Sequence, residues 1–158
     1  MSRLLVKGGA GFGRVVHVTP QSAGWSHVGF DLHRLAPGQT AAAATEGREA
    51  CLVFVAGRGT VTAGGEELGV LGERMSPFDG KPWSVYVPQG SDWSVTAESA
   101  LELAVCSAPG LGGGLPARVI GPDAVGQETR GRGTNTRHVT NILPETEPAD
   151  SLLVVEVV

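Results

Sequence analysis

The sequence predicts an all-β fold of the sandwich or barrel class. Short apolar stretches recur along the 158 residues, and each one is bounded by Gly, Pro, Asp or Ser. The 24 glycines and 10 prolines are scattered between these stretches without a repeating period, which indicates many turns. Helical periodicity is nearly absent. With 41% hydrophobic and 18% charged residues, the chain has the composition of a globular domain.

The strands are expected where short apolar or alternating runs occur between turn residues. In chain order they are predicted at 14–19, 27–35, 50–56, 59–63, 83–87, 93–97, 101–106, 137–143 and 151–158. Gly64 and Gly65 are predicted at the tip of a tight hairpin, because glycine adopts positive φ at little cost.

The segment 27–35 alternates between two kinds of side chain. Val28, Phe30 and Leu32 are separated by polar residues and glycine, so one face of this strand is expected to be apolar. The other face is expected to be a polar strand edge exposed to solvent.

The glycine- and proline-rich loop at 108–117 is predicted to separate two parts of the chain. We expect an amino-terminal barrel over residues 1–110, followed by a connecting segment with terminal strands over 111–158. The apolar run at 151–158 needs a neighbouring strand, either earlier in this chain or in another subunit. A homo-oligomer, in the simplest case a dimer, is therefore expected.

Charge and hydropathy exclude several classes of partner. The formal net charge of −4 argues against binding to nucleic acid. No apolar stretch approaches the length of a membrane span, and residues 1–9 lack the features of a secretory signal. Cys51 and Cys106 lie in apolar runs and are predicted to be buried reduced thiols, which favours a cytoplasmic location.

Several stretches carry a family resemblance in one continuous order. They are 19–38, 51–61, 74–90, 101–110, 130–144 and 150–157. On these stretches the chain resembles the cupins and, more closely, the amino-terminal half of the 5-deoxy-glucuronate isomerase family. The resemblance implies a cupin-type double-stranded β-helix, a jelly-roll-like barrel. It also implies sugar-acid aldose–ketose isomerisation in myo-inositol catabolism.

Members of that family continue into a second cupin that opens with a histidine-rich metal motif. The resemblance therefore implies a divalent metal only in that second cupin, and no cofactor in this chain. Because the second cupin is not part of these 158 residues, the chain alone is expected to be inactive. The catalytic residues are not identified from the sequence.

The general cupin metal pattern can be laid on this chain residue by residue. Its first two histidine positions fall on Ala44 and Glu46, and its glutamate position falls on Ala50, with Glu49 beside it. Its third histidine position falls on Trp93. Neither a methyl group nor an indole coordinates a metal ion, so the barrel is predicted to be metal-free. If Trp93 faces the barrel interior, it fills the space that a metal and substrate would otherwise occupy.

The histidines offer one alternative metal site. His33 and Asp31 are two residues apart on one strand face, with His27 further back, and could supply two ligands. The competing interpretation is a polar strand edge, which we favour. His17 and His138 are predicted to be structural histidines.

The most concentrated polar segment is 130–138. Its arginines could clamp the carboxylate of a sugar acid through paired hydrogen bonds. The predicted substrate-binding residues are Arg130, Arg132, Asn135 and Arg137. In the alternative interpretation these arginines form ion pairs with Glu128, Glu145 or Glu147. Two other functions stay open, a non-catalytic cupin that binds sugar acids and a pure assembly module.

Overall fold

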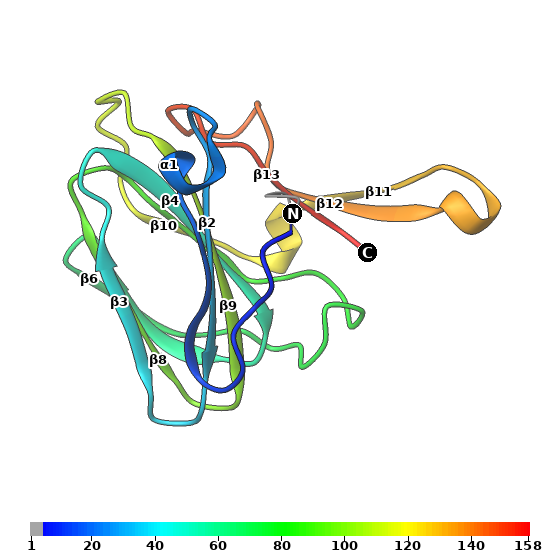
Figure 1. Cartoon of the computed structure of the whole chain (residues 1–158), viewed down its shortest axis with the longest axis horizontal. Coiled ribbons are helices and arrows are strands. Elements are labelled where there is room, and N and C mark those ends of the chain that lie inside the picture. Colours follow the sequence, from blue (N-terminus) through cyan, green and yellow to red (C-terminus); the bar gives the residue numbers. More distant parts are fainter. Residues whose placement is uncertain (1–4) are drawn as a thin grey trace.

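The structure is a computed structural model that describes residues 5–158 (Figure 1). Most strands belong to two antiparallel sheets that face each other. The six-stranded sheet contains, in spatial order, β1 (Gly13–Val18), β2 (Gly29–Leu35), β9 (Leu101–Pro109), β4 (Arg48–Ala56), β7 (Ser84–Val87) and β10 (Arg118–Ile120). The four-stranded sheet contains β3 (Thr40–Ala44), β8 (Asp92–Ala97), β5 (Gly59–Ala63) and β6 (Glu66–Leu71).

The inner faces of the two sheets form one core. Alternate residues of β4 and β9, such as Leu52, Phe54 and Leu103, meet Val61 and Val95 from the opposite sheet. All five are essentially inaccessible to solvent. Together the two sheets form the cupin-type double-stranded barrel that the sequence predicts.

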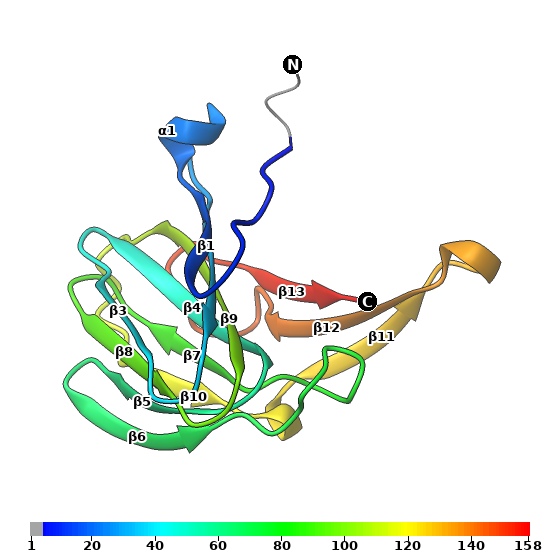
Figure 2. The ribbon, with the colours of Figure 1, turned by 60° about the horizontal axis from the view of Figure 1, so that its bottom comes forward.

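The third sheet lies outside the barrel and is built from the tail. It contains β11 (Gly126–Arg130), β12 (Arg137–Leu143) and β13 (Val154–Val157), with β12 in the middle. Figure 2 shows β11 and β12 extending away from the barrel as a hairpin arm. The remaining elements are the helix α1 (Pro20–Ala23) and the 3-10 helices η1 (Pro122–Ala124) and η2 (Gly133–Asn135).

A second core lies between the tail and the outer face of the six-stranded sheet. Cys51, Val53 and Tyr86 of the barrel pack there against Ile142 and Leu152 of the tail. The apolar face predicted for the segment 27–35 also points this way. Both faces of the six-stranded sheet are therefore covered, one by the opposite sheet and one by the tail.

The predicted strands agree with the structure, and two of them, 59–63 and 137–143, have the predicted bounds. Gly64 and Gly65 have φ of 61° and 83°, which confirms the tight hairpin. The sequence did not reveal β3, β6, β10 or β11. The tail adds β10 to the barrel, where it pairs with β7, and β13 finds its neighbour β12 within the chain.

Cys51 and Cys106 are free thiols, as predicted, with Cys51 buried and Cys106 partly buried. Within residues 5–158, no helix combines the length and the hydropathy needed to cross a membrane. The first four residues of the segment 1–9, for which the sequence predicts no secretory signal, lie outside the described residues.

Candidate functional site

The barrel interior does not supply metal ligands at the positions of the cupin pattern. Ala50 and Trp93 are each 4% exposed and belong to the inner core. Ala44 ends β3, and Glu46 follows in the turn with a φ of 53°. Within residues 5–158, no three His, Cys, Asp or Glu side chains gather in a way that could hold a metal ion. The donor set inside this barrel therefore does not fit a divalent cation.

Glu49, which lies beside the glutamate position of the cupin pattern, binds the tail and not a metal. Glu49 points outward from β4 and is fully buried beneath the tail. Its oxygens accept hydrogen bonds from the backbone N–H groups of Asp150 at 2.8 Å, Ser151 at 2.6 Å and Leu152 at 2.5 Å. The hydroxyl of Tyr86 donates a fourth hydrogen bond at 2.6 Å. Glu49 thus fixes the start of the last tail segment onto the barrel.

Tyr86 is well suited to donate to that carboxylate. Burial, followed by the hydrogen bond to Glu49, raises the pKa of the Tyr86 phenol well above its usual value. The phenol therefore stays protonated. The guanidinium of Arg118 lies over the Tyr86 ring at 4.6 Å from its centre.

A second buried charge holds β13. The side chain of Arg74 is 3% exposed and forms an ion pair with Glu156 of β13, with one N–O distance of 2.9 Å. Arg74 also donates hydrogen bonds to the carbonyls of Val55 at 3.0 Å and Gly80 at 2.8 Å. Its donors are therefore largely satisfied, as a buried guanidinium requires.

The polar face of β2 points into the opening of the barrel, so the prediction of a solvent-facing polar edge is wrong. The ring of His33 meets Trp93 edge-on, with 6.1 Å between ring centres. Leu35, two residues later on the same face, belongs to the inner core. Phe30 and Leu32 on the opposite face pack beneath the tail. The tail covers the apolar face, and the polar face is left to line the barrel.

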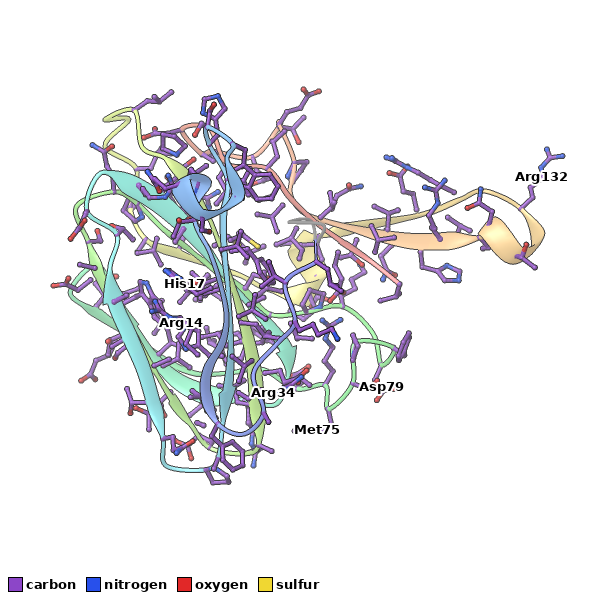
Figure 3. The ribbon with its side chains drawn as sticks, viewed as in Figure 1. Arg14, His17, Arg34, Met75, Asp79 and Arg132 are labelled. Atoms are coloured by element: carbon purple, nitrogen blue, oxygen red, sulfur yellow. The ribbon has the colours of Figure 1, made fainter. Side chains whose placement is uncertain are left out.

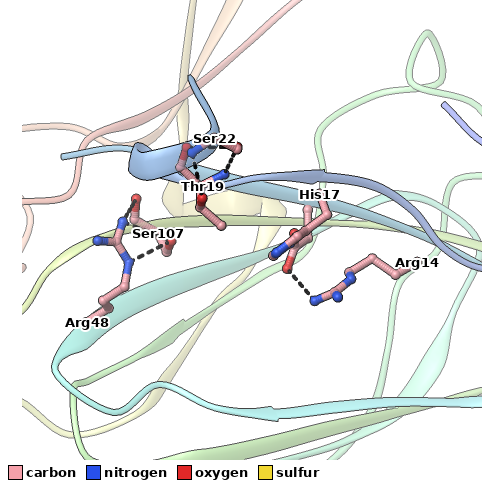
Figure 4. A network of polar contacts seen from close by, with 7 residues as sticks. Arg14, His17, Thr19, Ser22, Arg48 and Ser107 are labelled. Atoms are coloured by element: carbon pink, nitrogen blue, oxygen red, sulfur yellow. Dashed lines mark hydrogen bonds and ion pairs between the residues drawn. The ribbon is translucent and has the colours of Figure 1, made fainter. Parts of the chain in front are cut away.

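A cluster of charged and polar groups lies at this opening. Nδ1 of His17 is 2.5 Å from Oδ1 of Asp31, and the Arg14 guanidinium is 3.8 Å from the same carboxylate (Figure 4). Burial lowers the pKa of His33, Asp31 raises it, and Arg14 lowers it further. The contact at 2.5 Å shows that His17, and not His27, lies beside Asp31. The antiparallel pairing of β1 with β2 brings them together.

Arg48 closes one end of the same opening. Its guanidinium donates to the carbonyl of His27 at 2.6 Å and to the hydroxyl of Ser107 at 3.2 Å (Figure 4). Gly29 lies directly opposite Ser107 in the sheet. A Cβ at Gly29 would come within 2.6 Å of the Ser107 hydroxyl, so a larger residue there would require the Ser107 side chain to shift.

The predicted substrate-binding residues gather at the tip of the β11–β12 arm. Arg130 and Arg137 are opposite each other in the ladder, and η2 between them contains Asn135. Figure 3 shows Arg132 at the far end of the arm, pointing away from the barrel. The arm thus brings all four predicted residues together, at a distance from the barrel opening.

The alternative interpretation of these arginines holds for one of them. Arg130 forms an ion pair with Glu128 across the surface of the arm. The hydrogen bond from Arg130 lowers the pKa of the Glu128 carboxyl. The other predicted structural histidine, His138, is 3.2 Å from the Thr129 hydroxyl on the neighbouring strand.

Comparison with known proteins gives a consistent result. The KduI/IolB family matches residues 4–158. The 5-deoxy-glucuronate isomerase of Geobacillus thermodenitrificans is 51% identical over 146 residues, which cover 92% of this chain and 53% of that protein. The 5-deoxy-glucuronate isomerase of Halalkalibacterium halodurans is 40% identical, over 90% of this chain and 54% of that protein.

A solved structure has the same fold. The crystal structure of an IolB-like protein from Salmonella typhimurium LT2 superposes with a TM-score of 0.91 at 49% identity. The match covers 96% of this chain and 58% of that chain. The chain spans about half the length of the curated relatives it matches. On the family match and these identities, the chain belongs to the KduI/IolB family.

Proposed function

We propose that this chain is the metal-free, supporting half of a 5-deoxy-glucuronate isomerase. The observation that carries the proposal is that this barrel is filled by apolar side chains, while the chain matches only about half the length of proteins named as isomerases. The relatives are named as isomerases and are about twice as long as the match, whereas Ala50 and Trp93 occupy the barrel where a metal would need donors. The isomerase chemistry, including any divalent metal, is assigned to the part of the enzyme that these 158 residues do not match.

In this proposal the two parts of the chain have separate tasks. Residues 1–110 supply the supporting barrel except for β10, and residues 111–158 supply the connecting segment with β10 and the strands outside the barrel. The arm carries Arg130, Arg132, Asn135 and Arg137 away from the barrel. Guanidinium groups form paired hydrogen bonds with carboxylates, so the arm lends these residues to the sugar-acid site of the complete enzyme.

We propose that the complete protein acts in the cytoplasm, in myo-inositol catabolism, as a homodimer without a nucleic-acid partner. The net charge of −4 supports the last point. Sedimentation of the complete protein tests the dimer, and a monomer at all concentrations contradicts it.

The activity is tested with a fusion protein. This chain is joined to the part of the Geobacillus thermodenitrificans relative that it does not match, and isomerisation of 5-deoxy-glucuronate is measured. We expect activity in the fusion and none in the chain alone. Arg132→Gln in the fusion should lower kcat/KM at least about tenfold, mainly through KM, because one charge-assisted contact to the substrate is lost.

Arg34→Gln is the matched control. Arg34 already bonds to Glu102 on the barrel surface at 2.9 Å, so its loss should leave kcat/KM unchanged. Activity of the isolated chain contradicts the assignment of the chemistry to the other half. An unchanged kcat/KM in the Arg132→Gln fusion contradicts the role of the arm.

A second candidate function is favoured by the opening of the barrel. Arg14, His17 and His33 surround Asp31 there, beside the edge of Trp93, and present several donors to a small anionic sugar. In this candidate the chain binds a sugar acid without turning it over. Calorimetry of the chain alone with glucuronate distinguishes the two functions. Binding that is lost in Arg14→Gln and retained in Arg132→Gln favours the second candidate.

A pure assembly module is the remaining alternative. Such a module binds no sugar acid, and its thermal stability rises with protein concentration. The same calorimetry, together with melting curves at several concentrations, separates it from the two binding functions.

A further inference from the structure

A small pocket of about 310 Å³ lies beside the glycine-rich loop that joins β9 to β10. Its polar lining comes from Gln89 and Ser91, which follow β7, and from Asp150 of the tail, and its apolar lining includes Pro88 and Leu115. Figure 1 shows this loop on the side of the molecule away from the tip of the β11–β12 arm. The volume lies at the lower end of the range of about 300–1,000 Å³ that is usual for small-molecule sites.

The carboxylate of Asp150 is held in place from two sides. The backbone N–H of Asp150 donates to Glu49 at 2.8 Å, and its Oδ2 accepts hydrogen bonds from the backbone N–H groups of Leu111 at 2.6 Å and Gly113 at 3.3 Å. A Cβ at Gly113 would overlap Oδ1 of Asp150, so the glycine allows the carboxylate to lie directly against the loop. Within residues 5–158, no group donates a hydrogen bond to Oδ1, which therefore remains as an acceptor for a ligand.

The amide of Gln89 is the second polar group of the pocket. A Cβ at Gly110 would overlap the Gln89 side chain, so the backbone of the loop packs closely on this amide. The amides of Gln39 and Gln127 are hydrogen-bonded within the chain. In the part of the chain that the structure describes, the amide of Gln89 has no such partner. Its two donors and its acceptor are therefore available to a ligand.

Ser91 adds a hydroxyl to the same lining. Its backbone carbonyl and N–H both bond to the hydroxyl of Thr45, at 3.0 Å each, which fixes the turn after β7. The side chain of Ser91 takes no part in these two bonds. The pocket thus combines a group that only accepts, the carboxylate of Asp150, with an amide and a hydroxyl that both donate and accept.

This combination suits the hydroxyl groups of an uncharged polyol. Each hydroxyl of such a molecule donates one hydrogen bond and accepts others, so neighbouring hydroxyls can bond to a carboxylate and to an amide. Pro88 and Leu115 offer an apolar wall to the C–H groups of a ring. A sugar acid is disfavoured, because its carboxylate would lie close to the carboxylate of Asp150.

We propose that this pocket binds a small, uncharged cyclic polyol. Oδ1 of Asp150 accepts a hydrogen bond from one hydroxyl, and the Gln89 amide and the Ser91 hydroxyl bond to its neighbours. The site goes beyond the proposed isomerase function, because its ligand is not a sugar acid. It shares no residue with the arginines of the arm or with the charged cluster at the barrel opening.

Calorimetry of the chain with myo-inositol and with D-glucose, two uncharged cyclic polyols, tests the proposal. We expect a Kd of about 1 mM or lower for at least one of them. No detectable binding of either polyol up to about 20 mM overturns the proposal. Neither polyol is the proposed isomerase substrate, and no turnover is measured, so failure of this site is distinguished from failure of the proposed function.

D-glucuronate tests whether the ligand has to be uncharged. It is titrated into the Arg14→Gln chain, because the barrel opening then lacks the guanidinium that would attract an acid. Glucuronate should bind at least about tenfold more weakly than the better of the two polyols, because Asp150 repels its carboxylate. Equal or tighter binding of glucuronate contradicts the proposal.

A matched pair of glutamine variants locates the site. Gln89→Met removes the amide and keeps the length of the side chain, so polyol affinity should fall about tenfold. Gln127→Met removes an amide from the arm and should leave the affinity unchanged. If both variants lower the affinity equally, or if neither does, the polyol does not bind beside Gln89 and the proposal is wrong.

A second pair moves the carboxylate without changing its charge. Gly113→Ala should weaken polyol binding about tenfold, because the new Cβ displaces Oδ1 of Asp150. Gly126→Ala is the control, since an added Cβ there meets no atom within 4 Å. Melting curves of each variant separate lost folding from a lost contact. Unchanged affinity in a folded Gly113→Ala chain overturns the proposal, and the glutamine pair decides the question if that chain does not fold.

Discussion

The barrel interior and the core beneath the tail are both apolar, but they differ in how charge is used. The interior is packed by side chains such as Phe54 and Trp93, and among residues 5–158 no charged side chain is fully buried in it. The core beneath the tail contains two buried charges, Glu49 and Arg74, and each bonds to the tail. The barrel is held by shape and buried area, whereas the position of the tail is specified by directed hydrogen bonds.

This difference explains where the chemistry of the chain is to be sought. Ala50 and Trp93 add to the apolar core, and neither side chain offers a metal donor. The polar residues that remain lie at the opening, at the clamps of the tail and on the arm. In the proposed function the tail carries the substrate-binding residues and the barrel supports them.

The largest expected effect comes from the barrel interior. Trp93→Ala should lower the free energy of unfolding by about 3–5 kcal/mol, because it leaves a cavity between the two sheets. Trp25→Ala is the control, since Trp25 is 53% exposed, and should cost less than about 1 kcal/mol. Denaturant unfolding measures both. Similar losses in the two variants would mean that Trp93 does not fill the interior.

The second-largest effect is expected where the tail is bonded to the barrel. Glu49→Gln should cost about 3 kcal/mol, because the amide keeps one acceptor oxygen and turns its NH2 group, itself a donor, toward two of the four donors that the carboxylate now satisfies. Hydrogen exchange should accelerate at residues 150–157 and stay unchanged in β4 and β9. Glu102→Gln, on an exposed ion pair, should cost less than about 1 kcal/mol. Uniform acceleration across the chain would show that the tail and barrel are not held separately.

The smallest effect concerns the opening of the barrel. The pKa of His33 is lowered below its usual value of 6.5 by burial, so the folded state resists protonation of this ring. The stability that neutral His33 contributes is present above pH 6.5 and is lost as the pH falls through the lowered pKa. Unfolding of His33→Gln should therefore depend less on pH between about pH 7 and pH 5 than that of the original chain. Parallel pH profiles would contradict this assignment.

Much of the barrel could be predicted from the sequence because its signals are local. Alternation and turn residues identified most strands, and the cupin pattern placed Trp93 in the interior. β11 was missed because all five of its residues are exposed and show no apolar alternation. β10 has only three residues, too few for a periodic signal.

The tail contacts could not be predicted because they join residues far apart in the chain. Glu49 is about a hundred residues from the backbone groups that it binds. The same cause made the prediction for β2 wrong, since alternation reveals two different faces but not which one is covered. The contact between His17 and Asp31 could have been predicted, because antiparallel pairing of the adjacent strands β1 and β2 places these two residues opposite each other.

The metal content of the purified chain shows whether this barrel holds a divalent ion. The chain is dialysed without a chelator, and its divalent metals are determined by elemental analysis. Because Ala50 and Trp93 stand where donors are needed, we predict well below about 0.1 ion per chain. About one tightly held ion per chain would show that this barrel is a metal centre after all.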